Sequence, residues 1–139
     1  MSAQKRADIA VIGAGIMGTA IVTRLMETGH KVHVFDLDKD KIAALGSKGA
    51  TAASSVEDAV FKSKFCILSL NHASIVRAVV FGPAGVVKAA TADKVLIDMS
   101  SIDPADTAEM SAKLRSETGM VWVDCPLSGG VPGALSGRL

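Results

Sequence analysis

The sequence has few of the residues that mark several common classes of protein. It has no tyrosine, one tryptophan and four phenylalanines among 139 residues, so it offers few aromatic rings on which nucleic acid bases could stack. Its formal net charge of +1 gives no electrostatic case for binding nucleic acid or an acidic membrane. No apolar run approaches the length of a bilayer span, and the first residues carry no signal-peptide pattern. We therefore expect a cytoplasmic protein with neither a nucleic acid nor a membrane partner.

Residues that form disulfides or bind metals are also scarce. The two cysteines, Cys66 and Cys125, each lie in or beside an expected strand and show no metal-like pairing. The three histidines, His30, His33 and His72, fall at surface-like positions with no partner constellation. We predict reduced thiols, no metal site and no catalytic histidine.

A glycine motif follows a short apolar run near the N-terminus. Residues 9–12 are apolar and partly β-branched, which predicts a strand buried on both faces of a parallel sheet. Gly13, Gly15 and Gly18 follow at G-x-G-x-x-G spacing. In a dinucleotide site the first glycine permits the tight turn, the second lets the backbone approach a pyrophosphate, and the third lets the helix pack closely on the strand. The phosphates then lie against free N–H groups at the positive end of the next helix.

The residues after the motif complete a strand–helix–strand pattern. A helix is expected over residues 19–28 with Gly29 as its stop, and a second strand over residues 31–35. That strand ends at Asp36, eighteen residues beyond Gly18, where an acidic side chain can accept hydrogen bonds from the adenosine ribose hydroxyls. The alternative is a glycine turn without a ligand. Strand, helix and acid together favour the dinucleotide site.

Strands and helices alternate over the rest of the chain. Helix starts are expected at Asp38, at Ser55 and at Asp103 followed by Pro104. The further strands expected are residues 50–53, 64–70, 94–99 and 120–124, and the last segment, 131–139, reads as weakly helical at best. This alternation predicts an α/β, Rossmann-type doubly wound and mainly parallel sheet with helices on both faces. The loops that follow the strands then meet at one edge of the sheet, where ligands bind.

A family resemblance covers essentially the whole chain and rests on four separate segments. They are the glycine motif at 13–18, the V-x-x-V-x-x-G-x-x-G stretch at 76–85, the I-D-M-S-S-I-D-P stretch at 97–104, and the D-C-P-L-S-G-G-V-x-G-A stretch at 124–134. They resemble the β-hydroxyacid dehydrogenases, the family of 3-hydroxyisobutyrate dehydrogenase and tartronate semialdehyde reductase. The chain is more distantly similar to the cofactor domain of 6-phosphogluconate dehydrogenase.

The resemblance implies roles for individual residues. Ser69, Leu70 and Asn71 would pass the adenosine half of the cofactor, although the family often has proline at the third position, and Ser101 would meet the nicotinamide ribose. Ser128, Gly129 and Gly130 would hold the substrate carboxylate with a hydroxyl and backbone N–H groups. Without the resemblance, Ser101 reads equally well as part of a helix-start turn, and residues 128–130 as a flexible loop. The full cofactor set expected is Gly13, Ala14, Gly15, Ile16, Met17, Gly18, Asp36, Ser69, Leu70, Asn71 and Ser101.

The residues near the adenosine ribose favour NAD over NADP. Asp36, and with it Asp38, places negative charge where a 2′-phosphate would lie, and like charges disfavour that phosphate. No arginine stands there, although Lys39 and Lys41 are nearby. We therefore expect NAD as the cofactor.

The resemblance also implies what the chain does not contain. In the family, a lysine on a long helix beyond the cofactor domain exchanges the proton at the substrate hydroxyl, and no lysine here lies in a matching motif. We expect residues 1–139 to form a dinucleotide-binding domain that is incomplete at its C-terminal end, with no catalytic residue of its own. The all-helical substrate and dimerisation domain would be absent, so an apolar sheet edge or helix-docking face would be uncovered, and the full-length form would be a homo-oligomer.

Two functions of different class follow. In the first, the chain is the NAD-binding portion of an oxidoreductase that transfers a hydride between NAD and the alcohol of a small 3-hydroxy acid of the 3-hydroxyisobutyrate, glycerate (tartronate semialdehyde) or threonate type. In the second, it is a stand-alone dinucleotide-binding or interaction module without catalysis. The sequence ends at 133–139 inside a family motif and not at a linker, which favours the first.

Overall fold

The structure, a computed structural model, describes residues 6–139. Its centre is one six-stranded parallel sheet. The strand order is β3-β2-β1-β4-β5-β6, and every neighbouring pair is parallel. The strands are β1 (Ile9–Ile12), β2 (Val32–Phe35), β3 (Thr51–Ala52), β4 (Phe65–Leu68), β5 (Val95–Asp98) and β6 (Val121–Asp124). The strand order reverses between β1 and β4, so the predicted doubly wound α/β fold is confirmed.

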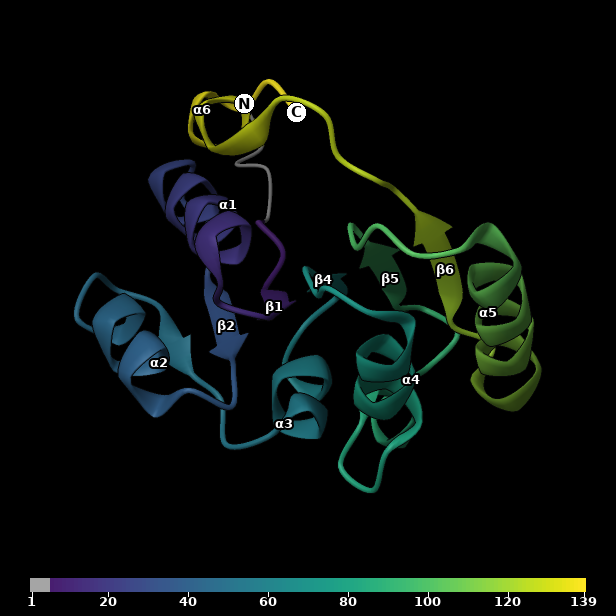
Figure 1. Ribbon diagram of the computed structural model, residues 1–139. Helices are drawn as coiled ribbons and strands as arrows, with labels where there is room; N and C mark the ends of the chain where they lie inside the picture. The colour runs from purple at the N-terminus through teal and green to yellow at the C-terminus, as the bar shows by residue number, and fades with distance from the viewer. Residues whose placement is uncertain (1–5) are drawn as a thin grey trace, which may run out of the picture.

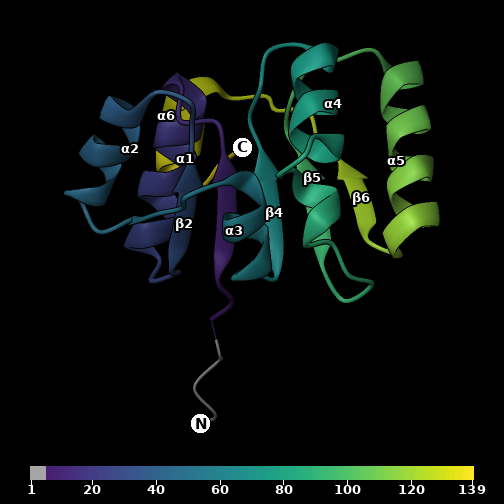
Figure 2. The same cartoon turned by 90° about the horizontal axis from the view of Figure 1, so that it is seen from below.

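Helices cover both faces of this sheet (Figures 1 and 2). Helices α1 (Ile16–Glu27), α2 (Lys39–Gly46) and α6 (Gly130–Ser136) contribute to the hydrophobic cluster on one face. Helices α3 (Val56–Phe61), α4 (Ala73–Phe81) and α5 (Pro104–Thr118), with the short 3₁₀ helix η1 (Val86–Lys88), contribute to the cluster on the other. The sheet thus lies between two helical layers, each with its own apolar core.

The central strands are apolar because both of their faces are covered. In β1, Ile9 and Val11 belong to one cluster, whereas Ala10 and Ile12 belong to the other. All four residues are buried, which explains why this strand is a continuous apolar run and not an alternating one.

Local capping signals set the ends of several helices as expected. The side chain of Asp38 accepts hydrogen bonds from two backbone N–H groups at the start of α2, and the Ser55 hydroxyl accepts one at the start of α3. Asp103 caps α5, Pro104 occupies its first position, and Gly119 ends it in the left-handed conformation.

Two helices differ from the sequence-based expectation. Helix α1 begins at Ile16, three residues before the expected start, so the glycine motif itself forms the first turn. The segment expected to be weakly helical contains α6, which lies on α1 (Figure 1). Ala134 is buried there, and Val131 packs against the same cluster. Local propensity is low because of the glycines and Pro132, and the contact with α1 is what supports the helix.

The expectation that His33 lies at the surface is wrong. Its side chain is buried in β2, and its Nε2 lies 2.9 Å from Asp8 Oδ2. Cys66 and Cys125 are both free, as expected, and burial raises the pKa of the Cys66 thiol to about 12. Among residues 6–139, no group of three or more potential ligand side chains could hold a metal ion. Within the same range, no helix has the length and apolar character needed to cross a membrane.

No helix among residues 6–139 lies over one face of β6. Val121 and Val123 of β6 point to the face that α1, α2 and α6 cover elsewhere, and they are 40% and 42% exposed. Figure 1 shows α6 stacked on α1, away from β5 and β6. These two valines form an exposed apolar surface on β6.

Candidate functional site

A cavity of about 640 Å³ lies at the edge of the sheet where the strands end. Its walls come from the loops after β1, β2, β4, β5 and β6 and from the first turns of α1, α2 and α4. This is the edge at which parallel α/β sheets bind ligands. The lining residues are Gly13, Gly15, Ile16, Met17, Asp36, Lys41, Ser69, Leu70, Asn71, Ile75, Met99, Ser101, Leu127 and Gly130.

The three glycines of the motif have different structural requirements. Gly13 has φ +100°, and a Cβ there would collide with the Ser69 carbonyl oxygen. A Cβ at Gly18 would collide with the Gly13 carbonyl oxygen, so these two positions need glycine for the packing of the turn itself. A Cβ at Gly15, by contrast, would have no atom within 4 Å. The protein's own packing therefore leaves Gly15 open on the cavity side, which fits a group that approaches the backbone closely.

The start of α1 is suited to a negatively charged group. Gly15 is its N-cap and provides no side-chain cap, and the first turn has no acidic residue. The first N–H groups of a helix have no intrahelical partner, so those at Ile16 and Met17 remain available beside the cavity. The helix dipole favours an anion at the same point. Ile16 lines the cavity and is 81% exposed, so its apolar side chain is available to a bound group.

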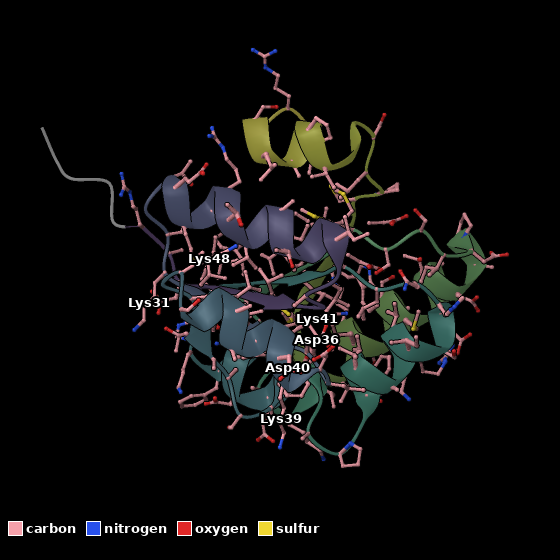
Figure 3. All side chains as sticks on the ribbon, turned by 60° about the vertical axis from the view of Figure 1, so that its left-hand side comes forward. Lys31, Asp36, Lys39, Asp40, Lys41 and Lys48 are labelled. Atoms are coloured by element: carbon pink, nitrogen blue, oxygen red, sulfur yellow. The ribbon has the colours of Figure 1, made fainter. Side chains whose placement is uncertain are left out.

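Asp36 joins the end of β2 to the glycine turn. Its Oδ2 accepts a hydrogen bond from the Ala14 N–H at 2.7 Å, and its Oδ1 accepts one from the Asp38 N–H at 2.8 Å. Each carboxylate oxygen can accept a further bond, so the side chain can still receive two ribose hydroxyls. Figure 3 shows Lys41 beside Asp36, whereas Lys31 and Lys48 lie apart from this pair. Lys41 therefore brings one positive charge to this end of the cavity.

The loops after β4 and β5 form the opposite wall. The Leu70 N–H donates to the Ser100 Oγ at 3.0 Å, and the Ser69 N–H donates to the Ile12 carbonyl at 3.0 Å. Strand β4 ends at Leu68, two residues before the expected end, and this leaves residues 69–71 free to line the cavity.

Asp98 is fully buried at the base of this wall. Its Oδ1 accepts the Ser100 N–H at 2.9 Å, and its Oδ2 has no hydrogen-bond partner among the described residues. Burial raises the pKa of this carboxyl above its usual value, while the hydrogen bonds from Ser100 oppose the shift. The charge of Asp124, its neighbour on β6, raises the pKa slightly further.

The loop after β6 closes the remaining side. Gly130 and Leu127 line the cavity, whereas Ser128 and Gly129, which the resemblance assigns to the substrate, do not. Gly129 and Gly130 have φ values of +121° and +61°. Two consecutive left-handed residues require glycine and direct the chain into α6.

The cavity gathers most of the predicted cofactor residues in one place. All of them line it except Ala14 and Gly18, which hold the turn from behind through the bond to Asp36 and the close contact with Gly13. Four further residues line the cavity that the sequence motifs do not predict: Lys41, Ile75, Met99 and Leu127. Lys41 and Ile75 come from the first turns of helices that follow site loops, so the position of a helix start was the available signal.

Comparisons with known proteins agree with this geometry. Residues 8–139 match the family described as the NAD binding domain of 6-phosphogluconate dehydrogenase. The chain is 39% identical over 136 residues to 2-(hydroxymethyl)glutarate dehydrogenase of Eubacterium barkeri, covering 98% of this chain and 45% of that protein. It is 35% identical to 3-sulfolactaldehyde reductase of Escherichia coli (strain K12), covering 96% of this chain and 44% of that protein.

A solved structure shows the same relation. 3-Hydroxyisobutyrate dehydrogenase of Mycobacterium tuberculosis, crystallised with L-serine, superposes with a TM-score of 0.85 at 30% identity, covering 94% of this chain and 44% of that one. The chain thus spans less than half the length of each of these three proteins. The glycine turn, the acid at the end of β2 and the match over residues 8–139 lead to one conclusion: the chain belongs to the family of the NAD binding domain of 6-phosphogluconate dehydrogenase.

Proposed function

We propose that this chain binds NAD in the cavity and forms the cofactor side of an oxidoreductase acting on a small 3-hydroxy acid. The observation that carries the proposal is the combination of an open Gly15, an uncapped α1 and the Asp36 carboxylate in one cavity. When bound, NAD supplies the hydride acceptor and, as NADH, the hydride donor. The start of α1 would hold the pyrophosphate, and Asp36 would accept hydrogen bonds from the adenosine ribose hydroxyls.

The remaining roles follow the order of the loops around the cavity. Residues 69–71 border the adenosine half, and Ser101 lies toward the nicotinamide ribose. Ser128, Gly129 and Gly130 hold the substrate carboxylate through a hydroxyl and backbone N–H groups, and Gly130 is the member that reaches the cavity. The relatives named above support a small acid with an alcohol or aldehyde group as the substrate class.

We propose that a group outside residues 1–139 exchanges the proton at the substrate oxygen. The resemblance assigns that step to a lysine in an all-helical domain, which would also join two copies of the full-length protein. We therefore propose that residues 1–139 are the dinucleotide-binding part of a longer enzyme that works in the cytoplasm as a homo-oligomer.

The charges of Asp36 and Lys41 bear on the choice between NAD and NADP. A 2′-phosphate would bring negative charge close to the Asp36 carboxylate, whose two oxygens already accept the Ala14 and Asp38 backbone N–H groups. Lys41 offsets part of the repulsion. We propose NAD as the preferred cofactor, with NADPH binding weaker by about tenfold, or about 1.4 kcal/mol.

The experiment is a calorimetric titration of the 139-residue protein with NADH and, separately, NADPH. We expect tighter binding of NADH, which Gly15→Val abolishes because its side chain occupies the space left for the pyrophosphate. Addition of NAD and 3-hydroxyisobutyrate, glycerate or threonate should give no turnover. Failure of both cofactors to bind the folded wild-type protein would refute the proposal.

A further inference from the structure

Ser100 occupies an unusual position relative to the cavity. Its two neighbours, Met99 and Ser101, both line the cavity, but Ser100 does not. Its side chain turns into the protein and is only 3% exposed. Ser100 therefore does not contact a ligand in the cavity. Its side chain can influence the cavity through hydrogen bonds to the backbone of residues that line it.

The hydrogen bonds of Ser100 connect the two loops of one cavity wall. Its Oγ accepts the Leu70 N–H at 3.0 Å, thirty residues earlier in the chain, and its own N–H donates to Asp98 Oδ1 at 2.9 Å. Ser69, Leu70 and Asn71 all line the cavity. One side chain therefore fixes the loop after β4 against the loop after β5.

Asp98 gives this connection a rigid base. It is fully buried at the end of β5, and its backbone carbonyl accepts the Cys125 N–H at 2.8 Å from the loop after β6. The same residue thus contacts the loops after β5 and β6, and Ser100 extends the contact to the loop after β4. We use the name β5 clasp for Asp98 and Ser100 together with the Leu70 N–H.

We propose that Ser100 is a positioning residue for the cofactor, which sets NAD affinity by holding residues 69–71 at the distance from Ser101 that the bound dinucleotide requires. This inference rests on the proposed function, since it assigns a role at the same cavity. The two loops border different halves of the cofactor, so one hydrogen bond between them affects a ligand that spans both. Without the clasp, the bound molecule would have to order this wall itself, and its affinity would fall.

The test compares two buried serines by replacing each with alanine. Ser100→Ala removes the acceptor for the Leu70 N–H, and we expect the Kd for NADH to rise about fivefold to tenfold, the effect of one lost hydrogen bond. Ser63→Ala is the control for loss of a buried hydroxyl, because Ser63 is also buried and lies just before β4, at the opposite end of the sheet from the cavity, and its Oγ has no hydrogen-bond partner among the described residues. Its Kd should stay within twofold of the wild-type value, even if its Tm falls by as much as that of Ser100→Ala.

Two further measurements separate positioning from general stability. Hydrogen exchange of the Leu70 amide should quicken in Ser100→Ala and not in Ser63→Ala. Ser100→Thr retains the hydroxyl and should restore NADH affinity. If Ser100→Ala does not fold, Ser100→Cys fills the site with a somewhat larger side chain of the same shape that is a weaker acceptor, and should raise the Kd while remaining folded.

The outcomes distinguish this inference from the proposed function. A wild-type protein that binds neither cofactor refutes both. Wild-type binding with a Ser100→Ala Kd within twofold of it, or with an equal loss in Ser63→Ala, overturns only the role of Ser100. A selective loss in Ser100→Ala that Ser100→Thr reverses supports the β5 clasp.

Discussion

Replacing Asp36 with alanine should change both the affinity and the selectivity of the cofactor site. In the structure this carboxylate accepts hydrogen bonds from the Ala14 and Asp38 N–H groups, and it has lone pairs left that could accept the ribose hydroxyls of the proposed cofactor. The substitution removes two hydrogen bonds from ribose hydroxyls to a charged acceptor, worth about 1.5 kcal/mol each at a partly exposed site. The total of about 3 kcal/mol corresponds to NADH binding about 100-fold more weakly.

NADPH should respond differently to the same substitution. Its 2′-phosphate is repelled by Asp36 and attracted by Lys41, so removal of the carboxylate relieves the repulsion while the lysine remains. The ratio of the two Kd values should therefore approach one or invert. Asp36→Asn should not rescue NADH binding. The two carboxylate oxygens accept the Ala14 and Asp38 N–H groups, one each, whereas an amide has a single oxygen and would turn its NH₂ group toward one of these donors.

Calorimetric titration of both cofactors, at one fixed salt concentration, measures these effects. Asp40→Ala is the control, because it removes the same charge from the first turn of α2 (Figure 3) without touching the hydrogen bonds of Asp36. Its affinities should change by less than threefold. If Asp36→Ala leaves the ratio of NADH to NADPH affinity unchanged, or if Asp40→Ala shifts it equally, the assignment of Asp36 to the ribose is refuted.

Three other predictions concern the turn, the buried acid and the uncovered face. Gly15→Ala should leave the Tm of the protein within about 2 °C of the wild-type value but weaken NADH binding at least tenfold. Gly18→Ala should lower the Tm, because a Cβ at Gly18 meets protein atoms and one at Gly15 does not. Equal losses of Tm in thermal melts of the two variants would contradict this. Burial raises the pKa of Asp98 in the folded state, so the folded protein keeps the proton on this carboxyl at a pH where the unfolded chain has lost it. The free energy of unfolding should therefore fall as the pH rises from about 4, and Asp98→Asn should flatten this slope in urea titrations. An unchanged slope in Asp98→Asn would argue against this role of Asp98. The exposed Val121 and Val123 should cause concentration-dependent association in sedimentation, which lysine at both positions should reduce; a wild-type monomer at every concentration would count against it.

Local sequence determined most of the fold because the signals involved act over a few residues. The apolar run of β1, the caps at Asp38 and Ser55, and Pro104 followed by Gly119 each fix a backbone conformation without help from distant parts of the chain. Their order along the chain predicts a parallel doubly wound sheet, and such a sheet places its strand ends at one edge. The cofactor residues could thus be proposed from the sequence.

Tertiary structure decided features whose cause lies far away in the chain. Helix α6 depends on α1, since its own glycines and proline disfavour a helix. His33 is buried because its strand lies between β1 and β3, and its Nε2 is 2.9 Å from Asp8 Oδ2. Sequence spacing could not show that Ser100 turns inward to Leu70, because that bond joins loops thirty residues apart. The motif residues were readable from the sequence, whereas the contacts that hold their loops in place required the folded chain.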